Sequence, residues 1–272
     1  TAADVLKILY EVNFASGESV DSPLEFEKVL SKEEDLLCDF ILECSPSKEF
    51  SEFFLAKNDF HNAQAFVRFK YLKVLPENLL TCKGIYSLEF LKDKILTDEY
   101  SGFYSELKNV LDVADEKFTT KKPFGAEIDE LFLNGLYKTM LNRAKNNAYL
   151  KKIIVHKIDC INIGIALRIR NYSDAKQYFI SGGSLSDADL KCLCLDSFEE
   201  IKNKFAFSSY SDLIKIAINE AEKNKPLVDF ECESDNYIIN LMQENKYATE
   251  GFLPFIQYCY YKTYDIINAR II

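Results

Sequence analysis

The residues in this sequence that could do chemistry are three pairs of Asp and Asn, each pair spaced three residues apart. They are Asp59 with Asn62, Asp159 with Asn162, and Asp265 with Asn268. Residues three apart share one face of a helix, so each pair presents a carboxylate and an amide together. Such pairs could act as ligands in a binding site, or they could cap and bridge neighbouring helices.

An arginine follows each pair, but not at one fixed spacing. Arg68 and Arg168 come six residues after the Asn, whereas Arg270 comes two residues after it. These arginines could pair with acidic residues across domains, although the unequal spacing weakens a uniform role. A polar group on a mostly apolar helix must find a hydrogen-bond partner or cost about 1–3 kcal/mol. Because the pair recurs three times, a shared structural role explains it more simply than three separate sites.

Other motifs give no better candidate for catalysis or binding. His61 and His156 occupy different positions of the repeat, so a shared metal or catalytic role is not expected. Gly182-Gly183 lacks the pattern of a phosphate-binding loop, and we interpret it and Gly84 as helix C-caps leading into Ser N-caps. Cys192 and Cys194 have the wrong spacing for a zinc knuckle. The sequence therefore predicts no catalytic residue, no cofactor-binding residue and no metal ligand.

Two further markers repeat with the Asp–Asn pairs and define a repeating unit. An acidic stretch begins with a proline at each of Pro23, Pro123 and Pro226, upstream of the pair. A glycine follows the pair in the first two copies, at Gly84 and Gly183. The period near 100 residues is too long for a solenoid of the usual 20–50-residue repeats. It suits a small helical domain present in several copies.

We therefore predict an all-α protein with similar helical domains in tandem. The 9 Gly and 6 Pro are too few for the many turns of an all-β protein. The predicted domains are residues 1–119, 120–222 and 223–272, the last one truncated and completed by the N-terminal segment. The sequence starts at Thr1 without Met and stops inside the third copy, so we expect truncation at both ends.

Within these domains the pattern predicts several element boundaries. Ser31 with Glu34 resembles a capping box that would open a helix after a shorter one. Ser87 and Thr97 are expected to cap two helices over residues 86–113. The first two Asp–Asn pairs are expected on long helices over residues 47–74 and 149–172.

Composition excludes some classes of partner. The net charge of −10 disfavours nucleic acid, because contacts with phosphates need clustered Lys and Arg. No run of about 20 apolar residues is present, so no membrane-spanning helix is expected. The 8 cysteines, without a signal-type segment, are typical of reduced thiols in the cytosol.

Taken together, these motifs resemble the C subunit of the V/A-type ATP synthase, the counterpart of the d subunit of the eukaryotic vacuolar ATPase. Asp265 stands where that family usually has Glu. The segments that carry the likeness are Lys57-Asn58-Asp59-Phe60-His61-Asn62, Glu127-Ile128-Asp129 with Tyr137, Lys157-Ile158-Asp159-Cys160-Ile161-Asn162-Ile163 with Arg168, and Tyr264-Asp265-Ile266-Ile267-Asn268-Ala269-Arg270-Ile271-Ile272.

The resemblance implies three similar helical domains in a funnel with pseudo-threefold symmetry, and a non-catalytic role in ion transport. In this family the C subunit sits between the proteolipid rotor ring and the central shaft of the D and F subunits, and it passes torque between them. We therefore expect a peripheral central-stalk protein at the cytoplasmic face of the membrane, with ring and shaft subunits as partners.

Two alternatives stay open at this point. A helical enzyme with a site between domains would show a deep pocket of clustered charged groups with perturbed pKa values. A generic helical scaffold would bind some other partner.

Overall fold

The computed structural model describes residues 2–17, 20, 22, 25–73, 79–120, 125–244, 247 and 251–271. All regular structure in these ranges is helical, and they contain no strand, so the predicted all-α class is confirmed. The prolines Pro23 and Pro123, which marked two of the predicted repeats, lie outside the described residues. The chain divides into two compact units, which we call unit 1 (Thr1–Arg143 with Ala248–Ile272) and unit 2 (Ala144–Tyr247). The three predicted domains rest on sequence similarity rather than packing, and they stay a prediction.

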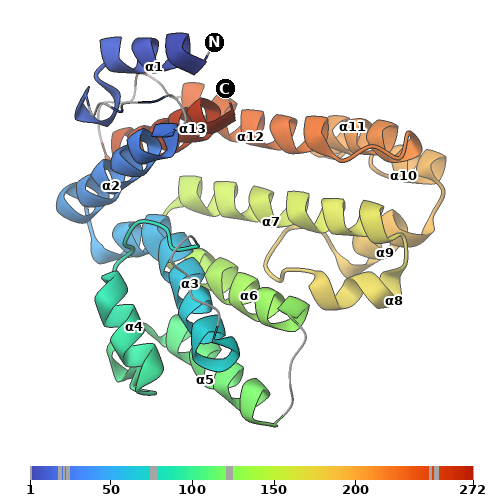
Figure 1. Cartoon of the computed structure of the whole chain (residues 1–272). Helices are drawn as coiled ribbons and strands as arrows, with labels where there is room; N and C mark the ends of the chain where they lie inside the picture. The colour runs from blue at the N-terminus through green and yellow to red at the C-terminus, as the bar shows by residue number, and fades with distance from the viewer. Residues whose placement is uncertain are drawn as a thin grey trace. The chain divides into compact units, whose positions relative to one another are not determined.

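Unit 1 is built around the long helix α3, against which α4, α5 and α6 pack (Figure 1). Its core contains Phe60, Phe66, Leu91, Leu107 and Ile128, all less than 4% exposed. The helices of unit 1 are α1 (Ala2–Glu11), η1 (Phe14–Gly17), α2 (Phe26–Cys44), α3 (Lys48–Leu72), α4 (Leu88–Leu96), η3 (Tyr100–Gly102), α5 (Ser105–Thr120), α6 (Gly125–Arg143) and α13 (Leu253–Ile271).

Helix α13 returns to unit 1 from the far end of the sequence and packs on α2. Ile266 joins an apolar cluster with Leu6, Phe14 and Leu30. Below it, the Phe40 ring stacks on Phe255 at 5.8 Å between ring centroids. The two ends of the chain thus share one core, and α2 packs against η1, α3 and α13.

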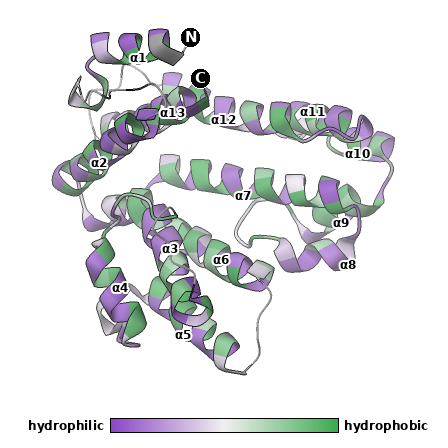
Figure 2. Cartoon of the chain, viewed as in Figure 1, coloured by the Kyte–Doolittle hydropathy of each residue, from purple (hydrophilic) through white to green (hydrophobic). Residues whose placement is uncertain are grey.

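Unit 2 is built around α7, which contacts α9, α11 and α12. Apolar residues lie along most of the length of α7 in Figure 2, as is typical of a helix surrounded by neighbours. Its core is formed by residues such as Ile163, Leu193, Ile214 and Phe230. The helices of unit 2 are α7 (Ala148–Ile169), α8 (Tyr172–Ala175), η4 (Lys176–Tyr178), α9 (Asp187–Leu195), α10 (Phe198–Lys204), α11 (Ser211–Glu222) and α12 (Val228–Gln243).

Three predicted local features are wrong. Ser31 does not open a helix, because α2 runs through it without a break and no Gly or Pro interrupts that stretch. Thr97 follows α4 as its C-cap instead of preceding a helix, whereas Ser87 does cap α4 by accepting the Phe90 N–H. Gly84 and Gly183 are not helix C-caps: Lys73 is the C-cap of α3 and Arg170 that of α7, both in the left-handed conformation.

Candidate functional site

In the first copy, Asp59 lies under the loop that joins α3 to α4 and holds it by its backbone. The side chain is 0% exposed. Its two carboxylate oxygens accept the N–H groups of Ile85 and Tyr86, both at 3.2 Å. The Tyr104 hydroxyl donates to the same carboxylate from 3.5 Å. A buried charge is tolerable only with such partners, so Asp59 fixes the loop and the start of α5 to α3.

One turn further along α3, Asn62 binds the same loop in both directions. Its Oδ1 accepts the Thr81 N–H at 2.9 Å, and its Nδ2 donates to the Cys82 carbonyl at 3.1 Å. The side-chain amide of Asn62 therefore satisfies backbone groups of Thr81 and Cys82, as the backbone of a neighbouring strand would do in a sheet. Together Asp59 and Asn62 anchor residues 81–86 to one face of α3.

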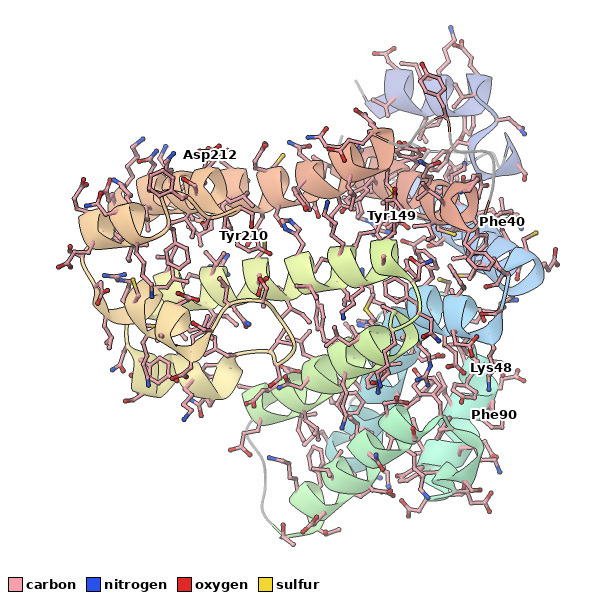
Figure 3. All side chains as sticks on the ribbon, turned by 180° about the vertical axis from the view of Figure 1, so that it is seen from behind. Phe40, Lys48, Phe90, Tyr149, Tyr210 and Asp212 are labelled. Atoms are coloured by element: carbon pink, nitrogen blue, oxygen red, sulfur yellow. The ribbon has the colours of Figure 1, made fainter. Side chains whose placement is uncertain are left out.

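The second copy repeats this arrangement in unit 2. Asp159 accepts the N–H groups of Ser184 at 2.8 Å and Leu185 at 3.2 Å, and the Tyr210 hydroxyl at 2.7 Å. Asn162 accepts the Ile180 N–H at 2.8 Å and donates to its carbonyl at 2.9 Å. Tyr210 comes from the start of α11, and its ring points toward α7 in Figure 3.

Each anchor includes a glycine pressed against the carboxylate. A Cβ on Gly84 would lie 2.1 Å from Asp59 Oδ1, and a Cβ on Gly183 would lie 2.2 Å from Asp159 Oδ1. Any other residue would displace the carboxylate or the loop. The repeated glycine that the sequence revealed is thus explained by close approach of the backbone to a buried acid.

The third pair lies in a different environment. Asp265 and Asn268 are both exposed on α13, although burial still raises the pKa of Asp265. Among the described residues, the loop anchor of the first two copies is therefore not repeated around Asp265 and Asn268. That they serve as a third structural pair stays a prediction.

Each of the three arginines pairs with one or two acidic residues of another helix. Arg68 pairs with Asp129 of α6, and Arg168 with Glu231 of α12 at 2.5 Å. Arg270 pairs with Glu27 and Glu34 of α2 at 3.2 and 3.1 Å. All these pairs are largely exposed, so each contributes about 1 kcal/mol or less. In terms of the predicted repeats, every arginine contacts an acid of a different repeat, and Arg270 returns to the first.

The sequence did not reveal a buried ionic cluster at the junction of α3, α5 and α6. The Arg143 guanidinium contacts Glu52, and it binds Glu106 through two nitrogens at 3.0 and 3.1 Å. Both glutamates are less than 9% exposed. Burial alone would raise the pKa of Glu106, but the hydrogen bonds from Arg143 and Asn142 lower it to about 2. The available signal was Glu52, a charged residue at an apolar-facing position beside Phe53.

The two histidines are placed separately. His156 is buried in unit 2, where its Nε2 lies 3.1 Å from the Ser234 carbonyl and its ring stacks on Tyr237 at 4.0 Å. Desolvation lowers the pKa of His156. His61 is exposed and its Nε2 lies 2.6 Å from the Leu79 carbonyl. Neither is part of a group of three or more His, Cys, Asp or Glu residues that could hold a metal ion within the described ranges.

Unit 1 contains an open groove of about 1100 Å³ between α2, the loop anchored by Asp59 and Asn62, and the end of α13. Carboxylates of α2 line one wall, but basic side chains already pair with several of them. Lys83 pairs with Asp39 at 2.5 Å, and Arg270 pairs with Glu27 and Glu34. Several carboxylates of the groove are thus held in ion pairs that link α2 to the anchored loop and to α13. Separately, no described helix has the length and apolar character needed to cross a membrane.

Comparison with known proteins places this fold in a family. The model of the ATP synthase (C/AC39) subunit family matches residues 1–272. The chain belongs to this family. It is 24% identical to the C subunit of the V-type sodium ATPase of Enterococcus hirae, over 91% of this chain and 76% of the relative. It is 23% identical to the C subunit of the A-type ATP synthase of Methanocaldococcus jannaschii, over 92% of this chain and 68% of the relative.

Family membership confirms the resemblance drawn from the repeated motifs. The loop anchors formed by Asp59 with Asn62, and by Asp159 with Asn162, thus lie in a member of the ATP synthase C/AC39 subunit family. Their carboxylates accept hydrogen bonds from backbone N–H and tyrosine O–H groups. That these residues serve a structural role stays a prediction.

Proposed function

We propose that this chain is a non-catalytic central-stalk subunit of a V/A-type rotary ATPase. In that role it would link the proteolipid ring to the central shaft formed by the D and F subunits, at the cytoplasmic face of the membrane, and so serve proton or sodium transport. The observation that carries the proposal is the family match over residues 1–272. The names of both relatives, each the C subunit of a V-type or A-type complex, support it.

The physical character of the two units also supports this proposal. A torque-transmitting part must resist deformation, and loops are the usual weak points of a helical protein. Here the loops after α3 and α7 are fixed by buried carboxylates and amides, and α3, α5 and α6 are joined by a buried Arg143 cluster. Stiffening of this kind suits a coupler between two rotating parts.

The first experiment asks which proteins the chain binds. A tagged chain is incubated with detergent-solubilised host membranes, and the retained proteins are identified by mass spectrometry. We expect ring subunits and the D and F shaft subunits among them. An acidic helical protein of similar size and charge serves as control. Retention of neither ring nor shaft would overturn the proposal, and a different partner recovered reproducibly would favour a scaffold role.

The second experiment separates coupling from catalysis. The purified chain is expected to hydrolyse no ATP alone. A complex depleted of it is expected to hydrolyse ATP without pumping ions, and addition of the chain should restore pumping per ATP hydrolysed. ATP hydrolysis by the isolated chain, or full pumping by the depleted complex, would contradict the proposed role.

A further inference from the structure

Two cysteines from distant parts of unit 1 meet at the edge of the groove. The Sγ atoms of Cys38 and Cys82 are 3.0 Å apart, although the residues are 44 positions apart in the sequence. Cys38 lies on α2 and is 4% exposed, whereas Cys82 lies on the anchored loop, is partly exposed and lines the groove. All eight cysteines are free in the structure. A disulfide needs the sulfurs about 2.05 Å apart, so a movement of roughly 1 Å would join this pair.

The surrounding residues hold the two thiols together independently of any bond between them. Asn58 of α3 donates its Nδ2 hydrogens to Cys82 Sγ at 3.1 Å, to Cys38 Sγ at 3.4 Å and to the Lys83 carbonyl. The next residue on each segment forms an ion pair, Lys83 with Asp39 at 2.5 Å. Asn62 also donates a hydrogen bond from its Nδ2 to the Cys82 carbonyl. The loop therefore cannot carry Cys82 away from Cys38 without breaking several contacts.

We propose that Cys38 and Cys82 form a reversible disulfide site that reacts with small-molecule disulfides of the glutathione class. This inference does not depend on the proposed function. In a reducing compartment the pair rests as thiols, and it would oxidise when the ratio of glutathione disulfide to glutathione rises.

The reaction proceeds by two exchange steps. The Cys82 thiolate, reached from the groove, attacks one sulfur of the small disulfide; a Cys82–glutathione bond forms and one glutathione thiolate leaves. Cys38 then loses its proton to solvent, and its sulfur attacks the Cys82 sulfur. The mixed bond breaks and the second glutathione leaves. Two protein thiols are thereby oxidised, and one small disulfide is reduced to two thiols.

The order of attack follows from the surroundings of each thiol. The hydrogen bond with Cys82, burial, and the nearby carboxylates of Asp35 and Glu34 raise the pKa of Cys38 far above its usual range. Cys38 therefore stays protonated in the resting pair. Once Cys82 is in the mixed disulfide, that hydrogen bond is lost and Cys38 becomes the resolving thiol.

The test uses the full chain in buffers of increasing glutathione disulfide, with thiols blocked by N-ethylmaleimide before proteolysis and mass spectrometry. We expect a peptide pair linked through Cys38 and Cys82, about 2 Da lighter than the reduced pair, while exposed Cys44 and Cys232 appear in no linked pair and are either alkylated or joined to glutathione. Oxidation is also expected to raise the Tm, because the bond closes a long chain segment. Dithiothreitol should reverse both changes.

Matched variants identify the role of each sulfur. Cys82→Ser should abolish the linked peptide and the rise in Tm, whereas Cys44→Ser should leave both unchanged. Cys38→Ser should stop at glutathione on Cys82. Three results in the wild-type chain would overturn the proposal: no oxidation at full glutathione disulfide, a stable mixed disulfide on Cys82 without resolution, or a linked peptide that joins Cys38 to Cys259 instead. Because the decisive readout is on the wild-type chain, a variant that fails to fold does not remove the test.

Discussion

A buried carboxylate can hold a loop only if the backbone N–H groups come within hydrogen-bond distance, and at Gly183 this distance leaves no room for a side chain. The nearest atom to a Cβ there is Asp159 Oδ1 at 2.2 Å, followed by Ile158 Cγ2 at 3.0 Å. The backbone of Gly183 is not in the left-handed region, unlike that of Gly182 with φ of 101°. The requirement for glycine at position 183 is therefore steric.

This predicts the cost of a single methyl group. Gly183→Ala should lower the free energy of unfolding by about 2–3 kcal/mol, because the carboxylate or the loop must shift and hydrogen bonds to Ser184 and Leu185 weaken. Gly125→Ala is the matched control: a Cβ built there meets nothing within 4 Å among the described residues beyond its own helix backbone, and Ala favours a helix. Urea unfolding measures both. A change below about 0.5 kcal/mol for Gly183→Ala would contradict the anchor.

Asp59 gives a prediction in pH. Burial raises its pKa from 3.8 to about 7, against hydrogen bonds from Tyr86 and Ile85 that lower it. The folded chain thus holds this proton more tightly than the unfolded chain. Its stabilising contribution is complete below about pH 4 and is lost as the pH rises through about 7, by about 4 kcal/mol. Asp59→Asn should remove that slope.

The measurement is the free energy of unfolding in urea at several pH values between about 4 and 8. Asp212→Asn, at a side chain 92% exposed and labelled in Figure 3, controls for the loss of one negative charge and should keep the wild-type slope. If the slopes of Asp59→Asn and the wild type agree, the buried acid does not titrate in this window.

At the scale of single residues, repetition in the sequence predicted the helix residues of each loop anchor, but not the loop residues that they bind. Asp59, Asn62, Asp159 and Asn162 could be predicted because they recur at a fixed spacing with a glycine behind them. Their partners could not, because Thr81, Ile180 and the two tyrosines are fixed by tertiary contacts across 18–51 residues. The exposed position of Asp265 likewise follows from its surroundings rather than from its motif.

Between elements, Arg143 links three helices of unit 1, because it reaches Glu52 of α3 and Glu106 of α5 from the end of α6. Removal of the cation would take the Arg143 ion pair from Glu106 and leave Glu52 with the exposed Lys48, at 3.3 Å, while each carboxylate is less than 9% exposed. An uncompensated buried charge costs far more than an exposed pair gains. The packing of α3, α5 and α6 should therefore depend on Arg143 much more than on the exposed pair of Arg68 and Asp129.

Arg143→Met is expected to lower the free energy of unfolding by about 3–5 kcal/mol. Arg168→Met, which breaks the exposed pair with Glu231, should cost about 1 kcal/mol or less. Thermal and urea unfolding compare them. If the loss comes from unpaired charge, Glu52→Gln and Glu106→Gln added to Arg143→Met should recover part of it. A further loss in the triple variant would show instead that packing of the guanidinium dominates.

The ends of helices could be predicted from the sequence where a local capping residue sets them. They could not be predicted where tertiary packing sets them. Ser87 caps α4 as predicted, because a Ser followed by apolar periodicity is a local signal. Ser31 has the same signal, but α2 continues through it, because residues on both sides of Ser31 are buried: Val29, Leu30, Glu33 and Cys38. A cap signal in the middle of a buried stripe is overridden by burial.

For the whole molecule, the division of apolar clusters decides which parts can fold alone. The large cluster around α7 draws all its members from unit 2. The clusters that cover α2, in contrast, combine Leu6 and Val29 with Ile266, and Cys38 with Cys259. Tandem repeats predicted from sequence do not give this division, because similarity between copies does not say where each copy finds its packing partners. Unit 1 therefore joins segments from both ends of the sequence, whereas unit 2 is continuous.

A continuous chain with its own core should fold without the rest. We expect residues 144–247 alone to keep the helix content of α7–α12 by circular dichroism and to unfold cooperatively. Residues 1–143 alone should leave the α2 face exposed, with Phe40 and Ile41 lacking the partners that α13 supplies. Such a fragment should bind a hydrophobic dye and unfold without a sharp transition.

The missing helix can be supplied separately, which makes the contrast decisive. A peptide of residues 251–272 added to residues 1–143 should restore a cooperative transition, because it returns Ile266 to its cluster and Lys262 to the buried Glu33. The same peptide carrying Ile266→Asp places a charge in that cluster and should not. If residues 144–247 are unfolded alone, or the peptide has no effect, the packing boundaries do not mark folding units. Cooperativity would then extend through the whole chain.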